Sequence, residues 1–166
     1  GQGDITIQTQ SAGGQIRFGT GAAQVNTMKI DESGRVTMPY QPAFYTYDMN
    51  WPSASAGVAV GGVVGVNIGN HYDSANGRFT CPITGVYEFS SLNQAYDSGQ
   101  TNYASIHFRI NGTTYGGQGY SGMASNNHAL ATTSMIVSLQ AGDYVQAGTD
   151  YGSRDIQNYF SGKLIG

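Results

Sequence analysis

Acidic side chains and histidines are the residues of this sequence that could support acid–base or metal chemistry, but their spacing does not assemble a catalytic site. Hydrolysis of a glycan needs two carboxylates at a defined separation, and most of the eight Asp and two Glu residues fall in turn sequences. His71, His107 and His128 lack metal-ligand spacing and have no triad companions nearby in the sequence. We therefore expect structural histidines and a protein that is not an enzyme.

Thiol chemistry and nucleotide binding are also poorly supported. Cys81 is the only cysteine, so it cannot form an internal disulfide, and it lies in an apolar segment beside Pro82. That setting favours a small buried residue over a reactive thiol. Residues 117–122 spell G-x-G-x-x-G, but a dinucleotide site needs a strand before this motif and a helix after it. The motif indicates a flexible loop instead.

The segment Asp73-Ser-Ala-Asn-Gly77 offers carboxylate and amide oxygens, which are the ligands that calcium prefers. It lacks the further alternating acids and the bidentate Glu of a calcium loop. A polar cluster that ends in Asn-Gly is typical of a chain reversal with positive φ angles. We therefore predict a turn at this position.

Binding is better supported than catalysis. Loops rich in Tyr, Ser, Gly and Asn are typical of recognition surfaces, because Tyr gives contact area at low entropy cost and small polar residues adapt their hydrogen bonds. Aromatic rings beside amides and hydroxyls would suit a sugar, although some of these tyrosines could pack in a subunit interface. The candidate contact residues are Trp51, Tyr96, Tyr103, Tyr115, Tyr120 and Tyr151. Trp51, the only Trp, either plugs the end of the domain or contacts a partner.

The composition argues against nucleic acid as a partner and against membrane insertion. A net charge of −3 and a pI near 5.4 provide no basic surface. The longest apolar run, residues 57–69, is interrupted by Gly and is too short to span a bilayer. The chain opens at Gly1 without a charged start and an apolar segment, so we expect no signal peptide and a piece of a longer protein.

Short strands must position these residues, because no stretch has the periodicity of a helix. Residues 105–110 and 113–115 alternate around Asn111-Gly112, which predicts a hairpin. We expect further loops at residues 116–127 and 150–157. Many short strands with regular turns indicate an all-β sandwich or jelly roll.

A domain boundary is predicted at Pro39-Tyr-Gln-Pro42, because each proline restricts itself and the residue before it. Residues 1–40 contain short alternating strands that are too polar to bury a core alone, so such units must stack on neighbours or across identical chains. Residues 1–40 are therefore assigned to a β-structured segment and residues 41–166 to a globular head.

The head resembles the C1q domain, the globular head of complement C1q-like proteins, which is related in fold to tumour necrosis factor ligands. The matching positions of its signature are Asn67, Tyr72, Phe79, Gly85, Tyr87 and Phe89, followed by Gly142 and Asp143 in an L-x-x-G-D-x-V segment and by Phe160 and Gly162 in an F-S-G-x-L segment. The family expects aromatic residues where this chain has Gly61 and Ser91. The resemblance covers residues 41–166 and implies a C1q/TNF-like jelly roll.

The same resemblance bears on metal binding. Asp150 and Asp155 flank a loop that lies near the trimer apex of C1q-like heads, where some relatives hold calcium. A shared calcium ion at these two carboxylates is therefore an open alternative, and no other cofactor is expected.

Residues 28–44, together with the earlier I-R-F-G-T-G run, resemble the segments that precede distal domains in tailed-phage fibres. The alternative is an ordinary β-rich linker with polar turns. The resemblance implies a virion protein that is trimeric along a shared shaft. We thus expect an extracellular homotrimer at the tail-fibre tip that attaches to a bacterial surface receptor, either a glycan or an outer-surface protein. Its rivals are a trimerisation cap without receptor contact, an enzyme that trims surface polysaccharide, and a cellular C1q-like secreted ligand.

Overall fold

A computed structural model describes residues 7, 9, 11–20, 25–51, 57–96, 103–122, 128–150 and 154–166. The chain divides into two compact units, Gly1–Gln41 and Pro42–Gly166. All regular elements of these described ranges are β-strands. Within the same ranges, no helix has the length and apolar character needed to cross a membrane.

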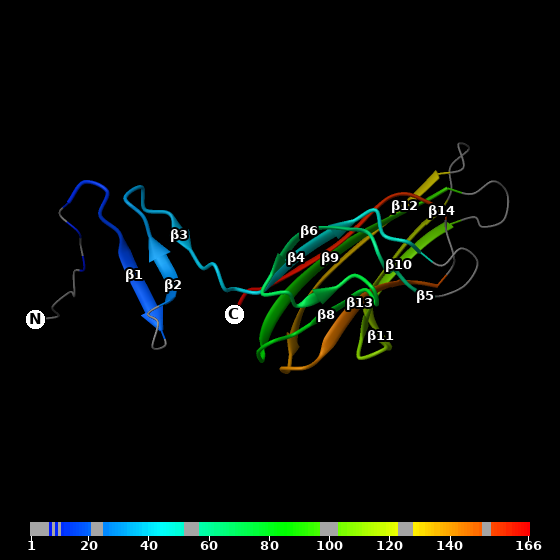
Figure 1. The fold of residues 1–166 in the computed structure, drawn as a ribbon. Helices are drawn as coiled ribbons and strands as arrows, with labels where there is room; N and C mark the ends of the chain where they lie inside the picture. The colour runs from blue at the N-terminus through cyan, green and yellow to red at the C-terminus, as the bar shows by residue number, and fades with distance from the viewer. Residues whose placement is uncertain are drawn as a thin grey trace, which may run out of the picture. The chain divides into compact units, whose positions relative to one another are not determined.

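The first unit is a three-stranded antiparallel sheet in the order β1-β2-β3 (Figure 1). Its strands are β1 (Ile16–Thr20), β2 (Val25–Ile30) and β3 (Val36–Thr37). Asp31 holds the turn between β2 and β3, because its Oδ1 accepts the backbone N–H groups of Ser33 and Arg35 at 3.0 and 2.9 Å. Phe18 and Val36 are exposed, as expected for a sheet too small to bury a core.

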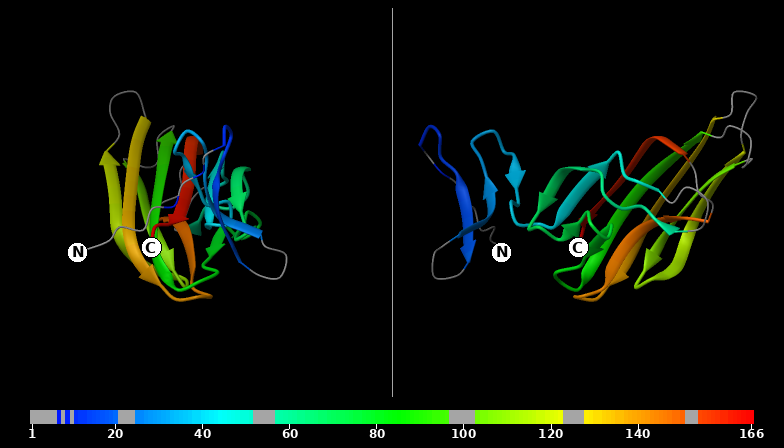
Figure 2. Two further views of the ribbon diagram at one scale, coloured as in Figure 1. Left: turned by 90° about the vertical axis from the view of Figure 1, so that its left-hand side faces the viewer. Right: turned by 45° about the vertical axis from the view of Figure 1, so that its right-hand side comes forward.

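The second unit contains two antiparallel sheets packed face to face (Figures 1 and 2). The strands are β4 (Ala43–Tyr47), β5 (Gly57–Val58), β6 (Val63–Ile68), β7 (Tyr72–Asp73), β8 (Arg78–Thr80), β9 (Gly85–Tyr96), β10 (Tyr103–Ile110), β11 (Thr113–Gly122), β12 (His128–Leu139), β13 (Tyr144–Thr149) and β14 (Arg154–Leu164). One sheet has the order β12-β9-β14-β4-β6 and the other β11-β10-β13-β8-β7, with β5 paired to β13. This arrangement confirms the predicted jelly roll.

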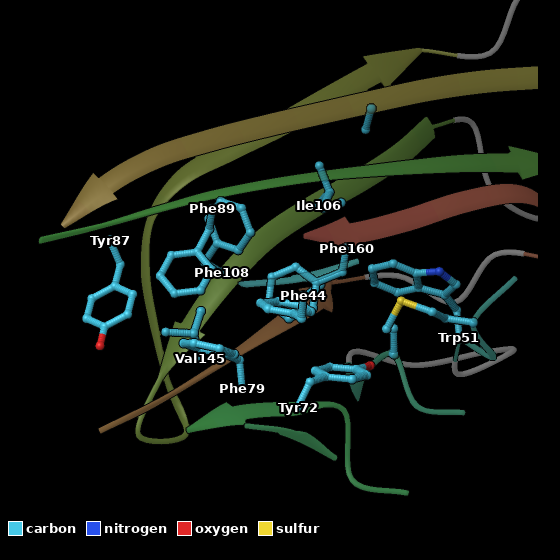
Figure 3. Packing of buried hydrophobic residues seen from close by; sticks show 14 of the residues in the cluster. Phe44, Trp51, Tyr72, Phe79, Tyr87, Phe89, Ile106, Phe108, Val145 and Phe160 are labelled. Atoms are coloured by element: carbon cyan, nitrogen blue, oxygen red, sulfur yellow. The ribbon is translucent and has the colours of Figure 1, made fainter. Parts of the chain in front are cut away.

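Stacked aromatic rings fill the space between the two sheets (Figure 3). The ring of Phe44 on β4 lies 4.8 Å from the rings of Tyr72 and Phe79 on the opposite sheet, and 4.7 Å from Phe160 on its own sheet. Tyr87, Phe89 and Phe108 are buried in the same cluster. Most aromatic positions of the sequence signature are therefore core residues, and burying such rings is the main favourable contribution to folding.

Polar and glycine positions of the signature shape the turns. Asn67 brackets the loop to β7, since its Nδ2 donates to the Tyr72 carbonyl at 2.9 Å and its Oδ1 accepts the Tyr72 N–H at 3.0 Å. Asp143 Oδ2 accepts the Gln140 N–H at 2.8 Å, and Gly142 between them has φ +93°. A side chain at Gly85 would meet the carbonyl oxygen of the last residue at 2.8 Å.

Strands occupy part of two segments that the sequence predicted to be loops. The hairpin at Asn111-Gly112 is present, with φ angles of +51° and +82°, but β11 continues through its glycines to Gly122, so the loop expected at residues 116–127 is wrong over its first half. A side chain at Gly119 would collide with the backbone of β12, so glycine there permits close approach and does not break the strand. Similarly, β14 begins at Arg154, inside the loop expected at 150–157.

Replacing Gly162 with Ala should destabilise the second unit by about 2 kcal/mol. A Cβ at Gly162 would lie 2.6 Å from a ring carbon of Phe89 and 2.8 Å from one of Phe44. Gly116→Ala is the matched control, because a Cβ there meets nothing within 4 Å. Urea unfolding of both variants measures the difference, and equal stability would show that the two rings are not packed against Gly162.

Candidate functional site

The outer face of the five-stranded sheet carries side chains that alternate with the buried aromatic residues. Strand register places these residues in neighbouring rows across the sheet. The outer face comprises Ala43, Tyr45, Tyr47, Val63, Val66, Ile68, Val86, Glu88, Ser90, Leu92, Gln94, Leu130, Thr132, Ser134, Ile136, Ser138, Gln157, Tyr159, Ser161 and Lys163. Ile136 is 68% exposed and Val66 is 42% exposed. A solvated face of an antiparallel sheet is normally polar, so this one is unusually apolar.

Charge is nearly absent from the outer face. Among its described side chains, only Glu88 and Lys163 are charged, and they pair with each other at 3.1 Å. Beside this pair lies a hollow of about 290 Å³, lined by residues of β4, β6, β9 and β14 that include Tyr45, Val66, Ser90 and Ser161. Several of the lining side chains are small, namely those of Ala43, Ser90 and Ser161.

The described tyrosines that were predicted to bind a receptor lie on strands toward both ends of the second unit. Tyr96 ends β9 opposite His128 and Arg154, and Tyr103 begins β10 opposite Gly122. These strand ends define the loop end of the second unit, which lies away from Pro42. Tyr151 lies outside the described residues.

The two described tyrosine side chains of β11 are well separated along that strand. Tyr115 pairs with Phe108 beside the Asn111-Gly112 turn, whereas Tyr120 pairs with Ser105 toward the loop end. Both are exposed, at 52% and 55% respectively. Tyr115 therefore belongs to the opposite end of the sheet.

Trp51 lies in the core, where its side chain is 7% exposed. This placement corrects its inclusion among the surface contact residues and supports the alternative that it plugs the end of the domain. Asn158 fixes the adjacent chain, since its Oδ1 accepts the Met49 N–H at 2.7 Å and its Nδ2 donates to the Met49 carbonyl at 3.0 Å.

A polar cluster near the loop end joins Asp150 to two strands. Tyr120 donates its hydroxyl to Asp150 Oδ2 at 2.7 Å, and the Asp150 backbone N–H donates to Ser105 Oγ at 3.0 Å. His107 Nδ1 lies 3.5 Å from Asp150 Oδ1 and has no hydrogen-bond partner, although the imidazole is only 4% exposed. The sequence predicted a structural histidine but not its position beside Asp150, because the two residues are far apart in the chain and meet only through the pairing of β10 with β13.

Burial lowers the pKa of His107, because the interior disfavours the charged imidazolium, and Arg109 acts in the same direction while Asp150 opposes it. Burial also raises the pKa of Cys81 to about 12, with a further contribution from Asp143. The Cys81 side chain is buried and its thiol stays protonated, as predicted for an inert cysteine.

Metal chemistry finds little support in the described ranges. They contain no group of three or more His, Cys, Asp or Glu side chains that could hold an ion. Asp73 is used in its own turn, where Oδ1 accepts the Ala75 N–H at 2.9 Å and Oδ2 accepts Asn76 Nδ2 at 2.7 Å. Calcium at Asp150 and Asp155 remains a prediction.

The C1q domain family matches residues 43–165, which is nearly the whole second unit. The chain belongs to the C1q family. Its C1q domain is similar to the globular domain of zebrafish complement 1qA protein, with 17% identity, a TM-score of 0.63 and coverage of 76% of this chain and 98% of that one. Murine APRIL at pH 8.5 is similar with 12% identity, a TM-score of 0.57 and coverage of 75% and 99%. No curated protein sequence matches the chain.

Two positions where this C1q domain departs from the expected aromatic residues have local explanations. Ser91 is buried, and its Oγ donates to the Tyr159 carbonyl at 2.7 Å, which satisfies the hydroxyl inside the fold. Gly61 has φ +72°, in the left-handed region that strains other side chains.

Acidification should destabilise the wild-type chain more than a His107→Gln variant. The pKa of His107 is lower in the folded chain than its ordinary value of 6.5, so the unfolded chain takes up the proton first. Stability from neutral His107 is therefore complete above pH 6.5 and is lost as the pH falls through the lowered folded value. Free energies of unfolding at about pH 7.5 and about pH 5 measure the effect. Parallel losses in both proteins would contradict it.

Proposed function

We propose that this chain is the distal part of a phage tail fibre, which assembles as a homotrimer and attaches to a receptor on the bacterial surface. The observation that carries the proposal is the outer face, which is apolar, almost uncharged and unpartnered in the single chain. Large exposed apolar surfaces mark interaction sites, and depletion of charge at the centre is typical of interfaces.

The composition of the outer face favours burial against a second copy of the chain over exposure to solvent. Its valines, leucines and tyrosines match the apolar and aromatic composition of a subunit interface, and the paired Glu88 and Lys163 leave no net charge to repel a copy. Membership of the C1q family supports self-association, and the resemblance of residues 28–44 to phage fibre segments supports the virion setting.

We assign the proposed receptor contact to the loop end of the second unit. Pro42 leads into β4 at the other end of the second unit, where Ala43 pairs with Lys163, so the loop end lies at the far end of this unit from the residue at which the unit begins. Three copies of each loop would turn weak single contacts into strong attachment through effective concentration. No step of this role requires catalysis.

A trimerisation cap without receptor contact is the second candidate, because the same outer face favours it. The two functions differ in whether the protein binds cells. Labelled protein mixed with bacteria of candidate host strains and recovered by centrifugation distinguishes them. Binding that saturates supports the receptor role, whereas a trimer that binds no strain sensitive to the parent phage would leave the cap.

Light scattering should give three times the 17.5 kDa chain mass, and Val66→Lys should reduce it toward a single chain. A charge on the outer face remains hydrated in the monomer but would be desolvated in an interface, which costs several kcal/mol. Ile83→Lys is the control, since Ile83 is 50% exposed outside the outer face. A monomeric wild type would overturn the proposed assembly, and a trimeric Val66→Lys variant would exclude this face.

A further inference from the structure

We propose that Tyr120, Gln118 and Asp150 form a subsite for a neutral, hydroxyl-rich sugar. This inference rests on the proposed receptor role and names the chemical class of the ligand. The three residues lie on β11 and at the end of β13, and Tyr120 connects them. Its hydroxyl lies 2.7 Å from Asp150 Oδ2 and 3.2 Å from Gln118 Oε1.

The ring of Tyr120 is presented in a fixed orientation. It is 55% exposed, yet its hydroxyl is anchored to a carboxylate, and charge-assisted hydrogen bonds of this kind are the strong ones. An exposed aromatic ring held from its polar end offers an apolar face against which the C–H groups of a sugar can pack. Because the anchor restricts the ring before binding, less entropy is lost when a ligand arrives.

Asp150 is in turn held by buried groups. Its backbone N–H donates to Ser105 Oγ, which lies 2.8 Å from Thr149 Oγ1, and both of these residues are buried. The carboxylate itself is 31% exposed. A binding residue supported by a rigid second layer is the arrangement that recognition sites need.

His107 lies against the same carboxylate and leaves one of its own polar atoms unpaired. Its buried Nδ1 faces Asp150 Oδ1 at 3.5 Å without a hydrogen bond. Buried polar atoms without a partner are rare, and each one calls for an explanation. A small movement of the carboxylate would complete this contact, so a ligand hydroxyl donating to Asp150 can be accompanied by a new bond to His107.

The geometry favours a sugar over a basic peptide. A guanidinium group binds a carboxylate best through both oxygens, but Oδ2 already accepts the Tyr120 hydroxyl and Oδ1 faces His107. A single hydroxyl needs only one remaining lone-pair direction. The amide of Gln118 adds both a donor and an acceptor within reach of the same ring.

Saturation-transfer NMR on the full chain tests the subsite with the methyl glycosides of glucose, galactose, mannose and N-acetylglucosamine. We expect at least one glycoside to bind the wild type. Tyr120→Ala and Asp150→Asn should each weaken that binding by about tenfold, and Tyr120→Phe should weaken it less than Tyr120→Ala because it keeps the ring. Tyr115→Ala is the matched control and should bind as the wild type does, since Tyr115 is equally exposed on the same strand.

Three results would overturn the subsite: no glycoside binds, Tyr115→Ala reduces binding as much as Tyr120→Ala does, or a lysine-rich or arginine-rich peptide binds at Asp150 in place of a sugar. Cell binding separates this failure from failure of the receptor role. If the Tyr120→Ala and Asp150→Asn variants bind bacteria as well as the wild type, the subsite is wrong and the receptor role stands. If the wild type binds no bacteria, the receptor role itself fails.

Discussion

The stacking of Phe44 between the two sheets is the contact on which the C1q domain depends. Phe44 belongs to one sheet, while Tyr72 and Phe79, whose rings lie 4.8 Å away, belong to the other. The absence of a side chain at Gly162 leaves the space that the ring occupies. Because interiors are packed as densely as organic crystals, the spacing of the sheets follows from these few residues, and the outer face is set by the alternation that turns Phe44 inward.

The interior changes character along the strands, from aromatic rings to hydrogen-bonded polar groups near the loop end. Asn93, Ser105, Thr149 and Asn158 are the buried polar residues of this part, whereas the buried Thr46 and Ser91 lie level with Phe160. Their bonds join separate strands, as when Asn93 Nδ2 donates to the Ser105 carbonyl at 3.1 Å. Hydrogen bonds are directional and unpaired groups are costly, so this region holds its strand ends in one arrangement. The proposed sugar subsite uses the outward end of the same network.

The fold could be predicted from the sequence because its signature residues act locally or fill the core. Asn67 and the Asn111-Gly112 pair indicate turns, and the spacing of the aromatic residues in the signature indicates a jelly roll. Other features depend on contacts between distant segments. The glycines of β11 led to the prediction of a loop. In the structure Gly119 is needed because the backbone of β12 lies too close for a side chain. The outer face and the pairing of Tyr120 with Asp150 emerge only from strand register, which spacing along one chain does not contain.

Strand β6 is an edge strand, where further strands could add to the sheet as they do in amyloid. It is the last strand of its sheet and pairs, within the described part of the chain, with β4 alone. A valine-rich edge of this kind is a template for adding further strands. Its register with β4 shifts between Tyr45 and Thr46, and Gly65 lies opposite the shift. Such irregularities twist an edge away from flat pairing. The irregularity at Gly65 therefore disfavours the addition of another strand at β6, although β6 contains no charged residue.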